Sequence, residues 1–562
     1  MSHPAPSFTW LDTTVVVVYC VGITLFGLWI SRKTRTSGGF FLGERRLPWW
    51  IMIGQSFGTG THAEGPVGQA GASYQHGFAT IWYQWKNMMA TPFYWLMAPW
   101  YRRTQRTTVG EIVEDRYGQS LGVVYSVFAI LYFVFNQGAM LKGAGKVIAM
   151  ATNNAMTPNE VVLSMTGAFL IYSFFGGLLA AAYTDFIQGF LIIVLSFMLI
   201  PRGLAEVGGI AGMRQCLRPE FFELYNQFSQ ISLAMIAMLT LNGLVGITAQ
   251  PHILSMCATG RTERAGRVGQ TYGSFVKRFC TIGWAFTGLI VAAMLCRRHE
   301  TLSDPEQAFG YACLHLLGPG LTGLLVACVL AANMSACSNF MVNIGALFTR
   351  NFYAPFFRPG ASDKELLWVG RGSGLGLTLF GVGFALIIKE VLQTFLFNET
   401  LPAFMGIMFM GGILWRRANR QGATASIITA FVVYYLVNHH LSGEWHLVYK
   451  WKAAPFGWAM LTGFVALLVV SLATRPEAPE RIDAFFDGLR RTSDEADLPA
   501  GQPQPWAADR GEDLLLYDLP GWLHRERWHR FFHRYREDLA GFLLAWISVG
   551  LIIGFAWGLM QI

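Results

Sequence analysis

The stretch of residues 53–67 combines polar groups that bind ligands with residues that break helices. It reads Ile-Gly-Gln-Ser-Phe-Gly-Thr-Gly-Thr-His-Ala-Glu-Gly-Pro-Val and interrupts an apolar segment long enough to cross a membrane. In hydrocarbon every backbone N–H and C=O needs a partner, so unwound backbone occurs at membrane depth only where protein or a water-filled cavity surrounds it. The sequence therefore predicts a broken helix that lines a binding site.

A second irregular segment lies five predicted spans later. Residues 242–251 read Asn-Gly-Leu-Val-Gly-Ile-Thr-Ala-Gln-Pro and again interrupt an apolar run with glycine, proline and amides. Corresponding Gly/Pro-interrupted segments in two halves of a chain indicate an inverted-repeat transporter with its site near the middle of the membrane. The side chains show no repeat, so the predicted symmetry depends on hydropathy and on the two helix breaks.

Composition places the elements around this site in a membrane. Of the 562 residues 53% are hydrophobic and 14% aromatic, and the mean hydropathy is +0.38. Such values are typical of a polytopic membrane protein. A formal net charge of +8 is also found in proteins that bind nucleic acid, but here the basic residues fall in short loops between apolar runs, where they set topology. We expect no nucleic-acid partner, and we expect no enzyme because no nucleophile–base pair or metal cluster stands out.

The apolar runs predict an all-α polytopic protein with about fourteen membrane-spanning helices. They lie near residues 13–30, 49–71, 78–100, 122–148, 161–176, 178–200, 231–255, 271–295, 320–346, 368–388, 401–415, 422–438, 456–473 and from 539 onward. Tight clusters of Arg and Lys, such as Arg102, Arg103 and Arg106, recur in every second loop. The positive-inside rule makes these loops cytoplasmic and places the N-terminus outside. We expect a multi-pass protein of the cell membrane, in a bacterium the inner membrane.

Several motifs resemble those of the sodium/solute symporter family, relatives of the sodium/glucose and proline symporters. They lie at Phe40–Trp50, Phe175–Gln188, Gln250–Ile253, Ala331–Ser335 with Leu347–Arg350, and Gly412–Ala423. The resemblance covers residues 10–473 and implies the leucine-transporter-type fold, a five-plus-five inverted repeat working by alternating access. It places an extra helix and loop at 1–48, the ten-helix core at 49–420, two additional helices at 421–474, a charged cytoplasmic tail at 475–538 and a final span at 539–562.

The resemblance also implies a sodium site and no organic cofactor. Motif positions assign the carbonyls of Gly58, Thr61 and Ala332 and the hydroxyl of Ser335 as ligands, and Asp185 to the ion path. The structural alternatives are that the Ser335 hydroxyl bonds to its own helix and that Asp185 stands at a helix N-terminus facing cytoplasmic water. A second serine that is usual in the family is Ala336 here, which predicts a weakened site. His62, beside these positions, titrates near neutral pH and could carry a coupled proton instead. Sodium coupling is the leading prediction, and proton-coupled or uncoupled transport is the alternative.

The predicted substrate is a small polar organic solute. Gln84 and Asn87 stand where sugar-transporting relatives have polar residues of other identity, so the resemblance supports a polar pocket without sugar specificity. The expected pocket residues are Glu64, Gln84, Asn87, Asn242 and Lys277. Counting 3.6 residues per turn, we expect Lys86 to point away from Gln84 and to pair with Glu64. Interhelical bonding or snorkelling is the structural alternative for Asn242 and Lys277.

The segment after residue 474 has a different composition. An aromatic and arginine-rich stretch at about 522–536 predicts an amphipathic helix on the anionic lipids of the inner leaflet, while 493–511 should be poorly ordered. A membrane sensor built on the transporter scaffold, with this tail as output, is an alternative of another class. We expect the core to fold and bind solute without the tail.

Overall fold

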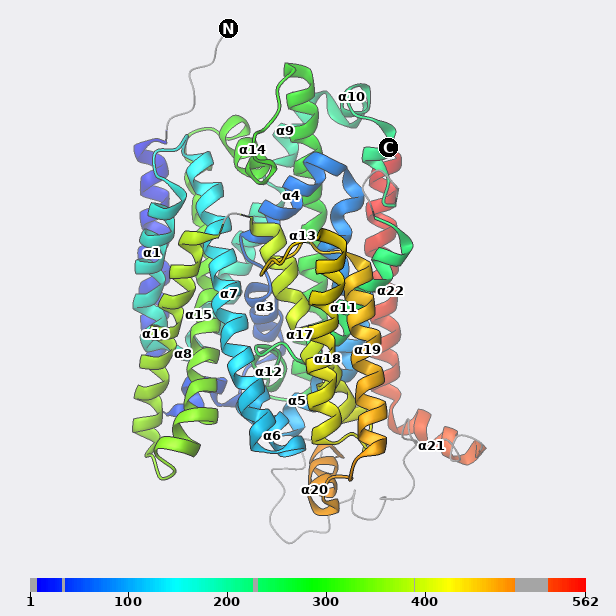
Figure 1. The fold of residues 1–562 in the computed structure, drawn as a ribbon. Helices are drawn as coiled ribbons and strands as arrows, with labels where there is room; N and C mark the ends of the chain where they lie inside the picture. The colour runs from blue at the N-terminus through cyan, green and yellow to red at the C-terminus, as the bar shows by residue number, and fades with distance from the viewer. Residues whose placement is uncertain (1–7, 33–35, 226–230, 389, 491–523) are drawn as a thin grey trace.

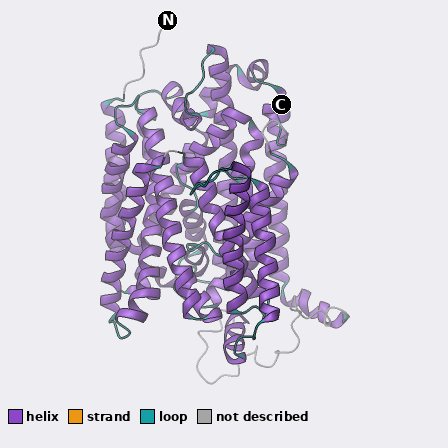
Figure 2. Cartoon of the chain, viewed as in Figure 1, coloured by secondary structure: helices purple, strands orange, loops and turns teal. Residues whose placement is uncertain are grey.

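The computed structural model describes residues 8–32, 36–225, 231–388, 390–490 and 524–562 (Figure 1). The described regular structure is helical (Figure 2), apart from one isolated bridge between Leu47 and Gly260. The α-helices are α1 (Trp10–Ser31), α2 (Ser37–Leu42), α3 (Trp49–Thr59), α4 (Glu64–His76), α5 (Thr91–Arg103), α6 (Val109–Tyr117), α7 (Gln119–Ala151), α8 (Pro158–Phe197), α9 (Ile200–Val207), α10 (Gly209–Cys216), α11 (Leu233–Thr248), α12 (Ile253–Ala258), α13 (Glu263–Arg298), α14 (Ala308–Leu316), α15 (Leu321–Phe348), α16 (Asp363–Ile387), α17 (Val391–Leu414), α18 (Arg420–Ser442), α19 (Ala453–Ala473), α20 (Pro479–Arg490), α21 (Arg525–Arg534) and α22 (Arg536–Gln561). Short 3₁₀ helices include η2 (Phe78–Tyr83) and η3 (Trp85–Asn87), and η6 (Thr349–Phe357) is a π-helix.

In the described part of the chain, ten helices are long and apolar enough to cross a membrane. The protein is therefore a multi-pass, all-helical membrane protein. The other segments in which we expect spans contain short or interrupted helices: α3 with α4, η2 and η3 with α5, α11 with α12, and the first half of α8. Length and hydropathy select fewer spans than the expected fourteen because these segments are broken or kinked.

The long helix α8 contains the kink that separates two expected spans. Gly177 has φ +61° and ψ −166°, a conformation that glycine adopts at little steric cost. A Cβ at this position would lie 2.6 Å from Cδ2 and 2.9 Å from Cα of Phe40. The positive φ and the close approach of Phe40 both require glycine, so the boundary expected between residues 176 and 178 coincides with a real change of direction.

The two ends of the bundle differ in what they carry. Figure 1 shows the start of α1 and the end of α22 at the end that holds α9, α10 and α14, whereas α6, α20 and α21 lie at the opposite end. The basic cluster at residues 102–106 directly precedes α6. By the positive-inside rule we expect the α6 end to face the cytoplasm.

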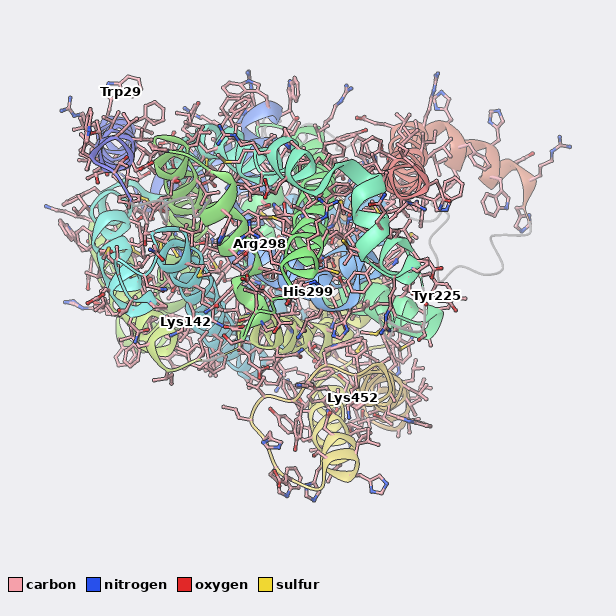
Figure 3. The ribbon with its side chains drawn as sticks, turned by 90° about the horizontal axis from the view of Figure 1, so that it is seen from above. Trp29, Lys142, Tyr225, Arg298, His299 and Lys452 are labelled. Carbon is pink, nitrogen blue, oxygen red and sulfur yellow. The ribbon has the colours of Figure 1, made fainter. Side chains whose placement is uncertain are left out.

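The C-terminal helices contact the core more closely than a loose tail would. Ile482, Phe485 and Phe486 of α20 are buried, and Asp483 forms an ion pair with Arg416. Asp538, at the start of α22, lies 2.6 Å from Arg267 of α13. Figures 1 and 3 show α21 extending outward from the bundle, as a helix on a membrane surface would. The expected disorder at 493–511 falls outside the described residues.

Removal of all residues after Thr474 should leave the core folded but less stable. Each large apolar side chain of α20 that loses its packing should cost about 1.5–3 kcal/mol, and the Arg267–Asp538 contact is lost as well. We expect a lower midpoint of thermal unfolding in detergent, measured by intrinsic fluorescence, with a monodisperse elution profile. A chain ending at Arg490, which keeps α20, separates its contribution from that of α22. Aggregation of both truncated chains would show that α22 is part of the folding core.

Candidate ion and substrate site

Both predicted helix breaks are present, and side chains satisfy their backbone groups. Between α3 and α4, the Ala63 N–H donates to Asn333 Oδ1 at 2.9 Å, and Asn333 Nδ2 donates to the Met140 carbonyl at 2.7 Å. Between α11 and α12, the Tyr125 hydroxyl donates to the Ala249 carbonyl at 2.8 Å. Protein groups thus supply the partners that unwound backbone needs in a membrane.

Asp185, on α8, is fully buried against α3 and α15, next to the first break. Its carboxylate accepts hydrogen bonds from Ser335 Oγ at 2.5 Å, Asn339 Nδ2 at 2.7 Å and Thr59 Oγ1 at 3.2 Å. The exposed fraction of Asp185 is 0%, which excludes a carboxylate at a helix terminus facing cytoplasmic water. Thr59 and Asn339 were not predicted from the sequence. Asn339 was detectable because it lies four residues after Ser335 and so shares its helix face.

Gly58 brings the last turn of α3 against this carboxylate. A Cβ on Gly58 would lie 2.8 Å from Ser335 Oγ and 3.0 Å from Asp185 Cβ, so no other side chain fits without a shift. The structure therefore brings together three of the predicted residues, Gly58, Ser335 and Asp185. The Thr61 N–H donates to the Gly58 carbonyl at 3.2 Å, and Ala332 lies one helical turn before Ser335 on α15.

The donor set at this position fits sodium. Thr61 Oγ1 is buried, and no described residue hydrogen-bonds to it. The carboxylate of Asp185, the hydroxyls of Ser335 and Thr59 and the backbone carbonyls around Gly58 are oxygen ligands of the kind that hard cations bind. Ala336 is also buried and contributes no oxygen. When ionised, the carboxylate of Asp185 would offset the charge of a monovalent cation bound there.

A polar cavity lies between the two breaks. It has about 60 Å³ open to the centres of water molecules, and His62, Gln84, Asn87 and Lys277 are among its lining residues. Gln84 and Asn87 flank and end η3, where residues three apart in a 3₁₀ helix lie on the same face. Two other expected pocket residues lie behind the wall: Asn242 accepts from Lys86 Nζ at 3.3 Å, and Glu64 contacts His62.

Lys86 does not pair with Glu64, as the sequence predicts, but with Glu399 of α17. Lys86 Nζ lies 2.5 Å from Glu399 Oε2, and both side chains are more than nine-tenths buried at the cavity wall. The prediction is wrong because it assumed a continuous α-helix. Residues 78–87 instead form two short 3₁₀ helices joined at Gln84, so an angle counted at 3.6 residues per turn does not apply.

Glu399 is the centre of a network that sequence reasoning missed. Besides Lys86, its carboxylate accepts from Gln250 Nε2 at 2.8 Å and from the Tyr132 hydroxyl at 3.0 Å. The sequence could have indicated Glu399, because it is the only charged residue between Val391 and Leu414. An ionisable residue inside a membrane span is expensive and by default indicates a functional site.

The two remaining predicted side chains, Lys277 and His62, lie at the first break. Lys277 Nζ donates to the Gly60 carbonyl, in the turn between α3 and α4. The His62 ring contacts the Glu64 carboxylate and lies edge-on to Phe340, with ring centroids 6.3 Å apart. His62 is the residue that the alternative, proton-coupled mode would use, and that mode stays a prediction.

Comparison with known proteins identifies the family to which the chain belongs. Residues 40–430 match the family model described as the sodium:solute symporter family. The chain is 24% identical to sodium/myo-inositol cotransporter 2 of Oryctolagus cuniculus, over 88% of this chain and 82% of that protein. It is 26% identical to the osmoregulated proline transporter OpuE of Bacillus subtilis (strain 168), over 73% and 85%. It is 23% identical to the sodium/glucose cotransporter of Vibrio parahaemolyticus, over 76% and 85%.

Solved structures agree on the fold. The structure of a Na⁺-coupled sialic acid symporter in a substrate-bound outward-open state matches with a TM-score of 0.71 at 17% identity, covering 84% of this chain and 99% of that one. A nucleobase-cation-symport-1 family transporter in a closed conformation matches with a TM-score of 0.52 at 12% identity, covering 79% and 98%. The expected leucine-transporter-like fold is thus confirmed. By its sequence, its helical fold and the motifs around its broken helices, the chain belongs to the sodium:solute symporter family.

Proposed function

We propose that this protein is a sodium-coupled symporter that imports a small polar organic solute by alternating access. The observation that carries the proposal is the buried carboxylate of Asp185, held by Ser335 and Thr59 where Gly58 leaves room for no side chain. A cation bound there would neutralise Asp185 and contact the first helix break. The same break lines the polar cavity through His62 and Gly60.

The fold supports the remaining steps. In the proposed five-plus-five arrangement, the two halves of the core correspond through the breaks between α3 and α4 and between α11 and α12. The proposed sodium ligands are Gly58, Thr61, Ala332 and Ser335, with Asp185 beside them. Gln84, Asn87 and Lys277 would contact the solute directly, and Asn242 and Glu64 would hold the lining residues Lys86 and His62 in place. We place the protein in the bacterial inner membrane with its N-terminus outside and α21 on anionic lipids of the inner leaflet.

Uptake into proteoliposomes tests the proposal. Purified full-length protein should accumulate a labelled solute when sodium is imposed outside, and should not do so when potassium replaces sodium at the same membrane potential. A pH gradient without sodium is the matched control, because it drives uptake only in the proton-coupled alternative. Equilibration without accumulation under either gradient would indicate facilitated diffusion, and solute binding without any flux would indicate a sensor. Each of these results contradicts sodium-driven import.

A further inference from the structure

The wall of the polar cavity carries more cations than anions. Lys86, Lys277 and Arg278 line it, and among the described lining residues Glu399 is the only carboxylate. Glu399 is already occupied, since Lys86 lies 2.5 Å away and Gln250 and Tyr132 donate to its oxygens. One positive charge on the wall is therefore compensated by the protein itself.

Lys277 and Arg278 have no such counter-charge. In the part of the chain that the structure describes, neither forms an ion pair with a carboxylate. Lys277 Nζ donates to the neutral Gly60 carbonyl, which leaves two of its N–H groups for other acceptors. The exposed fraction of Arg278 is 4%, and no described residue accepts a hydrogen bond from its Nε. A buried cation without a counter-charge is costly, so a ligand that supplies one gains binding energy there.

The other two buried carboxylates near the cavity are engaged elsewhere. Glu64 lies behind the wall against His62. Asp185 is bound by Ser335, Asn339 and Thr59, and it is the group that a sodium ion would neutralise. Neither of them lines the cavity. With sodium at Asp185, Lys277 and Arg278 remain the positive groups that face the solute.

We propose that the transported solute is a small organic carboxylate, whose anionic group binds Lys277 and Arg278. The guanidinium of Arg278 suits a planar carboxylate, which accepts charge-assisted hydrogen bonds in a bidentate manner. Gln84 Nε2 and Asn87 Oδ1 are buried, and no described residue pairs with them, so they are placed to bind hydroxyl or amide groups of the same solute. This inference rests on the proposed function, since it names the class of solute for that site.

Binding to matched pairs of solutes tests the charge directly. Purified full-length protein in sodium buffer is titrated with gluconate and sorbitol, glycerate and glycerol, and lactate and lactamide, and thermal stability is the readout. We expect at least one acid of the panel to raise the unfolding temperature, with its neutral partner at least ten-fold weaker. Lys277→Gln and Arg278→Gln should each lower the ratio of the affinities for the acid and its neutral partner at least ten-fold, while Lys277→Arg should keep this ratio.

The control variant is Lys142→Gln. Lys142, which Figure 3 labels, also lies on a spanning helix, α7, but it is outside the cavity lining and donates to Asn159. The Lys142→Gln substitution should leave the preference for acids unchanged. The unfolding temperature of each variant without solute reports on folding. If Lys277→Gln does not fold, the Arg278→Gln and Lys277→Arg pair still decides the result.

The outcomes separate this inference from the proposed function. Sodium-driven accumulation of neutral solutes with no preference for acids would contradict the proposal that the solute is a carboxylate and would support the proposal that the protein is a symporter. Preferential binding of acids without sodium-driven accumulation would support the carboxylate and overturn the symporter. Failure of every acid in the panel to bind, or equal stabilisation by sulfate or phosphate, would also overturn the organic carboxylate.

Discussion

Replacing Glu399 by glutamine should destabilise the protein by about 3–5 kcal/mol, the cost of leaving one member of a buried ion pair without its partner. Glu399 is 7% exposed and Lys86 is 4% exposed, so the charge left on Lys86 would be poorly solvated. The amide also loses the charge that strengthens the hydrogen bonds from Gln250 and Tyr132. Denaturant unfolding of the protein in detergent, followed by intrinsic fluorescence, measures the change in the free energy of unfolding.

A double-substituted chain distinguishes charge from packing. Lys86→Met combined with Glu399→Gln removes both charges, and it should recover much of the lost stability because no buried charge is left uncompensated. The control is Asp115→Asn, which breaks the ion pair between Arg106 and Asp115 at the surface. There we expect a loss of about 0–1 kcal/mol. An effect of Glu399→Gln no larger than that of Asp115→Asn would contradict a structural role for the buried pair.

Removing the Ser335 hydroxyl should have the largest effect on coupling. Ser335→Ala deletes an oxygen that lies 2.5 Å from Asp185, and substitutions around a metal site typically weaken metal binding by about 10- to 100-fold. Sodium-stimulated uptake should then be lost at sodium concentrations that saturate the unmodified protein. Ala336→Ser, which restores a hydroxyl that the family usually has, should tighten sodium binding. The sodium dependence of uptake measures both.

Ser338→Ala is the matched control on the same helix. Ser338 bonds to Ser173 and to the Met334 carbonyl, and its hydroxyl makes no described contact with Asp185. It should leave the sodium dependence unchanged. If a proton couples instead, Ser335→Ala should leave uptake standing, and His62→Ala should remove its dependence on a pH gradient. That pair of results would replace sodium with the proton in the proposed mechanism.

The sequence alone determined the class of the protein and the place of its two helix breaks. Hydrophobic length, basic loops, glycine and proline act locally, through hydrogen bonding of the backbone and transfer of side chains into lipid. The breaks after Thr59 and Thr248 and the change of direction at Gly177 therefore fall where the sequence predicts them. The motifs located Gly58, Ser335 and Asp185 for a different reason: a resemblance to a family implies that family's fold, and the fold brings these three residues together.

Only the tertiary structure decided which polar groups meet. Lys86 and Glu399 are 313 residues apart, and nothing local favours Glu399 over the nearer Glu64 as its partner. The 3₁₀ turns at η2 and η3 rotate Lys86 toward the cavity, and helix packing brings Thr59 and Asn339 to Asp185. A buried charge is stabilised by whichever opposite charge the packed helices place within a few ångströms. For these groups the distances are set by how η3 packs against α17, and α8 against α3 and α15, which no pattern along the chain records.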